Sequence, residues 1–166
     1  MKGEIAKFDI NWSKYLREMI IMKLKELKRK RVVLDASVIV KWFCDEEYTD
    51  IALRIRDKFF EGDLNVVVPE LMFYEVLNAV RYNEVFSKKD KWDIIDDLFS
   101  VDFDVVIPDR EILSEAMKLA LKTDTPIYDN VYLAVSRSAK CSFITADERY
   151  VDKIKANDVV FLGDWG

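Results

Sequence analysis

The sequence has 166 residues, of which 51% are apolar and 13% aromatic, so it can form one domain with a sizeable core. It carries a net charge of −5 and contains no histidine, which excludes histidine-based acid–base catalysis, Ser-His-Asp and Cys-His nucleophiles, and histidine-ligated zinc. Carboxylates are therefore the expected tools of any enzymatic activity.

Compartment and redox state are indicated by what the sequence lacks. It has no apolar run near the roughly 18 residues of a membrane span and no signal-peptide pattern at its N-terminus, so we expect a cytoplasmic protein. Cys44 and Cys141 lie far apart without CxxC spacing. We interpret both as small buried hydrophobic residues in a reducing compartment, outside any metal site.

Charge divides the chain into two parts. The first 31 residues contain ten Lys/Arg and four acidic residues, whereas residues 32–166 carry a net charge of −11. Within residues 11–30, Trp12, Leu16, Met19 and Ile20 recur at helical spacing between basic residues, with Asn11 or Ser13 as the N-cap. We expect a basic amphipathic arm over 1–30 and a globular domain over 31–166.

After Arg31, short β-branched runs alternate with longer helical patterns, which predicts an α/β fold of three layers around a mainly parallel sheet. Pro69 is expected to open one helix, and the "DASVIVKWF" pattern another. No GxGxxG or GxxxxGK[ST] motif supports nucleotide binding. The other predicted helices span 48–61, 88–100, 109–122 and 129–139. The predicted strands are 32–34, 64–68, 104–107, 142–145 and 158–162.

Four acids fall at or near the expected carboxyl edge of this sheet, where open α/β sheets place their sites. Asp35 and Asp147 directly follow strands, Asp129 starts a helix, and Glu75 lies inside an apolar helix with Asn78 on its stripe. Taken singly, each Asp is alternatively a helix N-cap and Glu75 a solvent-facing residue. Together, four carboxylates at one edge would repel one another unless a hard cation such as Mg²⁺ or Mn²⁺ holds them.

The sequence contexts of these four acids resemble those of a known protein family. In the contexts "VVLDASVIV", "PELMFYEVLNAV", "YDNVYLAVS" and "FITADERY", they resemble the PIN-domain family, and most closely its VapC-type toxin branch, over about residues 31–162. Ser37 and Thr145 match hydroxyl positions that accompany the acids in such proteins. A receiver or phosphoryl-transfer domain is disfavoured, because "VVLDAS" offers a single acid.

The resemblance implies a metal-dependent endoribonuclease that leaves 5′-phosphate and 3′-hydroxyl ends, acting as a toxin that a small antitoxin neutralises, and forming a homodimer. It implies Asp35, Glu75 and Asp129 as direct metal ligands and Asp147 as a direct or water-mediated one. Ser37, Thr145 and Asn78 would then orient these ligands or water. Alternatives are a PIN-fold nuclease of RNA maturation or decay, and a metal-binding interaction module without turnover.

RNA binding requires positive charge on an otherwise acidic body. Lys41, Arg81 and Lys88 are the candidate RNA-binding residues, together with the basic arm. The arm sequence "FDINWSKYLREMIIMKLKELKRK" also resembles the second helix of VapB-type ribbon-helix-helix antitoxins. Its basic end can equally complement a helix dipole, and the arm can pack on the body or pair in a dimer.

Overall fold

The computed structural model describes residues 11–166, without the side chains of residues 25–28, so the first ten residues of the expected arm lie outside the described part. Five strands form one sheet in the order β3-β2-β1-β4-β5, and every pairing is parallel. This confirms the predicted fold class. The strands are β1 (Lys30–Leu34), β2 (Leu64–Pro69), β3 (Asp104–Val106), β4 (Ser142–Thr145) and β5 (Val159–Phe161).

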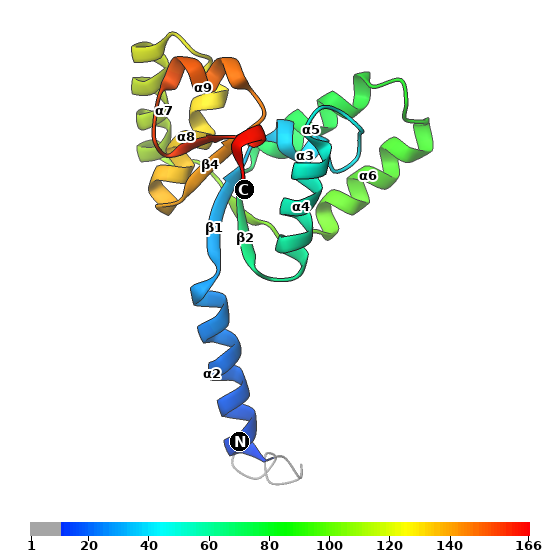
Figure 1. Cartoon of the computed structure of the whole chain (residues 1–166), viewed down its shortest axis with the longest axis vertical. Helices are drawn as coiled ribbons and strands as arrows, with labels where there is room; N and C mark the ends of the chain where they lie inside the picture. The colour runs from blue at the N-terminus through cyan, green and yellow to red at the C-terminus, as the bar shows by residue number, and fades with distance from the viewer. Residues whose placement is uncertain (1–10) are drawn as a thin grey trace.

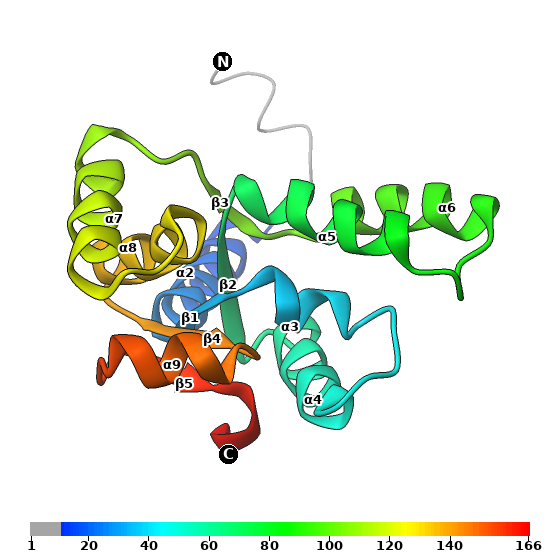
Figure 2. The ribbon, with the colours of Figure 1, turned by 90° about the horizontal axis from the view of Figure 1, so that it is seen from above.

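Helices cover both faces of the sheet. Viewed from above, α3 to α6 lie on one face and α7 to α9 on the other (Figure 2). The helices of the first face are α3 (Ala36–Val40), α4 (Thr49–Phe60), α5 (Leu71–Tyr82) and α6 (Lys88–Ser100). Those of the second face are α7 (Arg110–Thr123), α8 (Ile127–Ala139) and α9 (Glu148–Ile154), and a 3-10 turn, η1 (Leu162–Asp164), follows β5.

The central strand β1 sets the position of the functional edge. Val32, Val33 and Leu34 are fully buried, as expected of a strand that has neighbours on both sides and helices on both faces. Leu34 pairs with Ile144 of β4, and the next N–H, that of Asp35, donates to the Ile144 carbonyl at 3.0 Å. The carboxyl ends of β1 and β4 therefore lie side by side.

Two helix starts differ from the sequence prediction. Pro69 is the last residue of β2 and does not open a helix, because the N–H of Glu70 still donates to the Val106 carbonyl of β3 at 3.0 Å. The helix predicted from residue 129 begins at Ile127, so it takes in Asp129 as its third residue.

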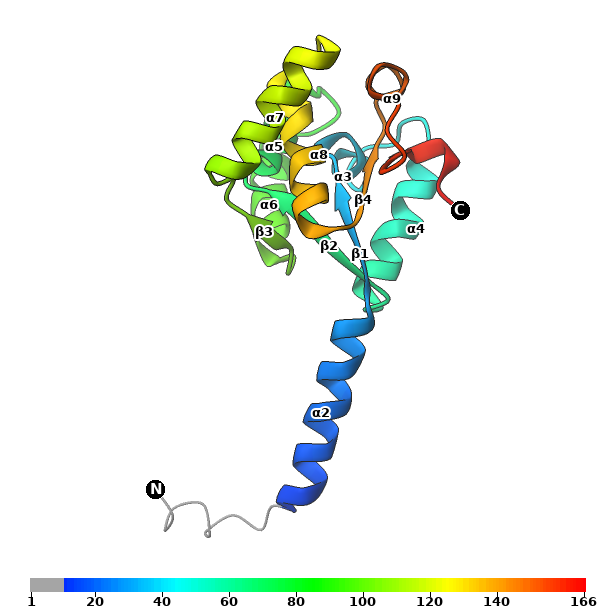
Figure 3. The same ribbon diagram turned by 90° about the vertical axis from the view of Figure 1, so that its left-hand side faces the viewer.

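The N-terminal helix α2 (Trp12–Lys28) projects from the amino end of β1, away from the body (Figures 1 and 3). Asn11 caps it, since its Oδ1 accepts the N–H of Lys14 at 3.0 Å. Among residues 11–166, none of the helices has the length and apolar character needed to cross a membrane.

Candidate carboxylate site

Asp35 is held by two hydroxyl groups. It occupies the N-cap position of α3, but no capping bond forms from its side chain to the described helix. Instead its Oδ2 accepts the Ser37 hydroxyl at 2.8 Å and the Thr145 hydroxyl at 2.5 Å. Burial raises the pKa of Asp35, although the Thr145 and Ser37 bonds act to lower it. Asp35 therefore takes the N-cap position without the capping bond that the N-cap alternative implies.

The same two hydroxyls bind the carboxyl end of β4. Thr145 Oγ1 accepts the N–H of Asp147 at 3.0 Å, and Ser37 Oγ accepts the N–H of Ala146 at 3.1 Å. Each hydroxyl thus uses both a donor and an acceptor capacity. The result is one bonded unit in which the orientation of Asp35 depends on β4, and the backbone leading to Asp147 depends on Asp35.

Glu75 faces this unit from α5. Its side chain is half-buried, so the solvent-facing alternative is wrong, and its Oε2 accepts the hydroxyl of Tyr132 on α8. Burial is the main cause that raises the pKa of Glu75 to about 7, with the charges of Asp35 and Asp129 adding to it and the Tyr132 bond opposing it. A glutamate with this pKa is partly protonated near neutral pH.

Asp129 lies in the first turn of α8, whose N-cap position is Pro126, so Asp129 is not the cap. Burial is the main cause that raises the pKa of Asp129 to about 6, and the charges of Asp35 and Asp147 contribute to the same rise. Like charges shift a pKa in this way only over short distances. Asp129 is therefore electrostatically coupled to two of the other predicted acids.

Asp147 differs from the other three. It is exposed, and its Oδ1 accepts the N–H of Tyr150 at 3.0 Å as the N-cap of α9. The N-cap interpretation is confirmed for this residue. Asp147 still raises the pKa of Asp129, so it lies at the margin of the same group.

The sequence analysis missed Tyr132. This residue is buried, and its pKa is raised by burial first and then by the charges of Asp35 and Glu75. The available signal was its position three residues after Asp129, which places both on one face of α8.

A second missed residue is Asn130, which is fully buried beside the site. Its Nδ2 donates to Thr125 Oγ1 and to the Pro126 carbonyl, both at 2.7 Å, and its Oδ1 accepts the Tyr150 hydroxyl at 3.3 Å. These bonds join the turn before α8 to α9. They hold the segment that carries Asp129, because a buried amide is costly to leave unpaired.

Asn78, predicted to support the ligands, is exposed on α5 one turn beyond Glu75.

The predicted RNA-binding residues are in two places. Lys41 is buried, and its Nζ lies 2.7 Å from Glu46 Oε2, so its charge is already paired.

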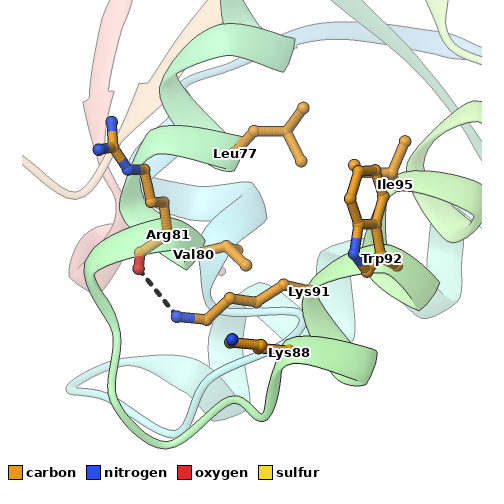
Figure 4. Close-up of a pocket in the computed structure, with 7 residues that line it drawn as sticks. All are labelled: Leu77, Val80, Arg81, Lys88, Lys91, Trp92 and Ile95. Atoms are coloured by element: carbon orange, nitrogen blue, oxygen red, sulfur yellow. Dashed lines mark hydrogen bonds between the residues drawn. The ribbon is translucent and has the colours of Figure 1, made fainter.

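Arg81 and Lys88 instead share a pocket of about 410 Å³ between α5 and α6 (Figure 4). Lys91 also lines this pocket and donates from Nζ to the Arg81 carbonyl at 2.8 Å. The exposed ring of Trp92 forms another wall. We call this cavity the basic pocket, because three of its lining residues carry positive charge.

The acids match a hard divalent cation in chemical type. They offer only oxygen ligands. Burial is the main cause of the raised pKa values of Glu75 and Asp129, and the charges of neighbouring acids add to it, a repulsion that a bound cation would relieve. In the described part of the chain, however, no three or more acidic, cysteine or histidine side chains form a ready-made metal cluster. The carboxylates would therefore have to move closer together around an ion.

Comparison with known proteins places the fold. A family model described as PIN domain matches residues 32–156. No curated protein sequence matches this chain. A toxin–antitoxin complex from Klebsiella pneumoniae superposes with a TM-score of 0.58 at 14% identity, over 79% of this chain and 97% of the other.

Two further solved structures show the same fold. The protein PAE2754 from Pyrobaculum aerophilum has a TM-score of 0.59 at 21% identity, over 81% of this chain and 90% of its own. DNA-bound VapBC from Salmonella typhimurium has a TM-score of 0.58 at 14% identity, over 80% of this chain and 98% of the other. At such identities the likeness establishes the fold alone.

Proposed function

We propose that this chain, which belongs to the PIN domain family, is a metal-dependent endoribonuclease that acts as the toxin of a toxin–antitoxin pair. The observation that carries the proposal is the electrostatic coupling of the four acids at the carboxyl edge of the sheet. In addition to burial, the charges of Asp35 and Asp129 raise the pKa of Glu75, and the charges of Asp35 and Asp147 raise the pKa of Asp129. Such a group suits phosphodiester hydrolysis without histidine.

In this proposal Asp35, Glu75 and Asp129 hold Mg²⁺ or Mn²⁺ directly, and Asp147 does so directly or through water. A bound divalent cation would lower the pKa of a coordinated water and offset negative charge on the phosphate. Both carboxyl groups must be deprotonated for this role. The pKa of Glu75 is raised to about 7 and that of Asp129 to about 6, so each is partly protonated at or below these pH values. Cleavage is therefore expected to strengthen as the pH rises above 7.

Hydroxyl groups of this chain set the direction of two of these carboxylates. The Ser37 and Thr145 bonds both engage Oδ2 of Asp35, and the Tyr132 bond engages Oε2 of Glu75. Each residue is thereby oriented through one oxygen, and we assign the other oxygen, Oδ1 or Oε1, to the cation. Outer-shell bonds of this kind keep ligands in place.

The basic pocket supports an RNA substrate. Arg81, Lys88 and Lys91 can bind phosphates, and the Trp92 ring, which is 71% exposed, offers a surface for base stacking. The pocket shares helix α5 with Glu75, so a strand bound there would run along the helix that carries an active-site acid. Asn78, exposed between the two, would line that path.

Toxin activity and an antitoxin partner are supported by the solved structures of the same fold, which include a toxin–antitoxin complex and DNA-bound VapBC. We include a small antitoxin protein and a homodimer in the proposal. Expression of the chain alone should arrest bacterial growth, and expression of Asp129→Asn should not. Equal growth of both cultures would contradict the toxin role, whether or not the purified chain cleaves RNA.

The test of catalysis is cleavage of a mixed-sequence RNA by the purified full chain with Mn²⁺ or Mg²⁺, beside an EDTA control. We expect cutting only with metal, products with 5′-phosphate ends, and loss of cutting in Asp129→Asn. The matched control is Asp152→Asn, which removes an exposed acid of α9 outside the site. Products ending in 2′,3′-cyclic phosphate would instead reveal a contaminating metal-independent ribonuclease.

Isothermal titration with Mn²⁺ separates the alternatives. Metal binding that is weakened in Asp129→Asn, without cleavage of any RNA, would favour a binding module over an enzyme. Cleavage that survives in Asp129→Asn and Glu75→Gln would contradict the assignment of the site.

A further inference from the structure

The projecting helix α2 carries an apolar stripe that the rest of the described chain leaves open. Trp12, Leu16, Met19 and Ile20 lie on one face of the helix and are 43%, 57%, 46% and 59% exposed. Figures 1 and 3 show that the helix stands clear of the body in both views. A continuous exposed apolar stripe of this length marks an interaction surface.

The charge of α2 restricts what can cover this stripe. Its sequence contains five basic and two acidic residues. Two copies of α2 lying against each other would bring like charges together, which opposes association. The best-matched surface is therefore both apolar and acidic.

The body has such a surface between α5, α6 and β3. A groove of about 460 Å³, here called the β3 groove, is lined mainly by apolar side chains. Tyr74, Phe99 and Ile107 in it are 64%, 70% and 75% exposed.

Acidic residues accompany the β3 groove. Glu70 lines it, and the exposed Asp96, Asp97 and Asp102 lie on or just after the same end of α6 that contributes Phe99. The basic pocket at the other end of α6 has the opposite charge and would repel α2. Charge therefore selects the β3 groove over the basic pocket as the partner of a basic helix.

Length also agrees. From Trp12 to Leu24 the helix spans about 18 Å at 1.5 Å per residue, and the 13 residues of α6 span about 20 Å. The helix cannot easily turn back to its own groove. Only Arg29 separates α2 from β1, and Arg31 of β1 is tied to Asp104 of β3 by a 2.7 Å ion pair.

We propose that α2 of one copy docks in the β3 groove of a second copy, and that the exchange is reciprocal and forms a two-fold dimer. Each copy then buries its apolar stripe and receives a basic helix beside its acidic groove, as an isologous interface requires. This contact is independent of the carboxylate site. The arm is thereby an assembly element of the protein.

The experiment measures the oligomeric state of the full chain by sedimentation velocity over a range of concentrations. The expected result is a dimer, with a dissociation constant raised about tenfold or more by Leu16→Lys/Ile20→Lys in the arm and by Ile107→Lys in the groove. The matched control is Leu121→Lys on α7, because Leu121 is 80% exposed but lies outside the groove. This control should dimerise like the unaltered chain, and circular dichroism confirms the folding of each variant.

Mixing the two weakened proteins makes the test specific. The Ile107→Lys copy keeps an intact arm and the arm variant keeps an intact groove, so a 1:1 mixture should form a heterodimer that neither forms alone. Higher salt should weaken it, since opposite charges contribute. A monomeric full chain, or an Ile107→Lys protein that dimerises as well as the control, would overturn the proposal. The second outcome would show that the arms pair elsewhere.

Discussion

The hydroxyl of Thr145 donates to Oδ2 of Asp35 at 2.5 Å, which joins two residues 110 positions apart across the neighbouring ends of β1 and β4. Thr145 is fully buried and also accepts the N–H of Asp147. One hydroxyl thus positions an acid that we assign to metal binding and the backbone of a second. Its removal is the most direct test of how the site is organised.

Thr145→Val keeps the shape of the side chain and removes the hydroxyl. We expect Mn²⁺ affinity and RNA cleavage to fall about 10- to 100-fold, because Asp35 loses the bond that orients it. Thr145→Ser retains the hydroxyl and should keep most of the activity. Titration calorimetry and cleavage rates provide the measurement, and a Val variant as active as the Ser variant would contradict the assigned role.

Tyr132→Phe removes the hydroxyl that bonds Glu75. Since that bond lowers the pKa of Glu75, its loss should raise the pKa above about 7. NMR titration of the glutamate carboxyl group reports this directly, and cleavage at pH 7 should fall more than cleavage at pH 8.5. Tyr128→Phe, at an exposed tyrosine of the same helix, is the control. An unchanged Glu75 titration would refute the expected coupling.

The metal-free protein should lose stability as the pH rises. Glu75 and Asp129 have folded-state pKa values of about 7 and about 6, above their ordinary values of 4.5 and 3.8. The folded state therefore binds more protons than the unfolded state between these values. The stabilisation is complete below the ordinary values and is lost as the pH rises through 6 and 7.

Urea unfolding in EDTA across this pH range gives the measurement. We expect the free energy of unfolding to decrease toward pH 8, a smaller decrease in Glu75→Gln, and recovery at pH 8 when Mn²⁺ is added, since a ligand stabilises the state that binds it. Stability that rises with pH in EDTA would show that burial and repulsion do not dominate at these carboxyl groups.

Removing Lys88 and Trp92 tests the basic pocket. In Lys88→Ala and Trp92→Ala, we expect KM for RNA to rise while kcat changes little, because both residues lie away from the carboxylates. The Lys88 variant should also reduce the salt slope of single-stranded RNA binding by about 0.7 per lost phosphate contact. Lys118→Ala on α7 is the control, since its side chain is 75% exposed outside the pocket. An unaltered KM would exclude the pocket from substrate binding.

Local patterns were sufficient for the fold. The helix predicted over 88–100 matches α6 (Lys88–Ser100), and the continuous apolar run at 32–34 lies within the central strand β1. Both signals come from neighbouring residues, whose periodicity and burial a sequence displays directly. The error at Pro69 arose because the fixed φ angle of proline is compatible both with the end of a strand and with the first turn of a helix.

Long-range contacts were beyond the reach of these patterns. The Tyr132 hydroxyl meets Glu75 from 57 residues away, and the candidate cation Lys41 is instead buried against Glu46. No local periodicity encodes which side chains two packed helices bring together. Arg81 and Lys88, two of the three candidate RNA-binding residues, do share one pocket, because the turn between α5 and α6 keeps them close in sequence and in space.

Asp35 and Asp147 show which features the sequence determines and which depend on the tertiary structure. Each follows a strand and precedes a helix, so the amino-acid pattern places both at the carboxyl edge but assigns them the same choice between cap and ligand. In the folded chain, Asp147 caps α9, whereas Asp35 is bonded by Ser37 and Thr145. The difference arises from the partners that the fold brings to each side chain: Asp35 meets Thr145 of the adjacent strand β4, whereas the exposed Asp147 finds its partner in the first turn of its own helix.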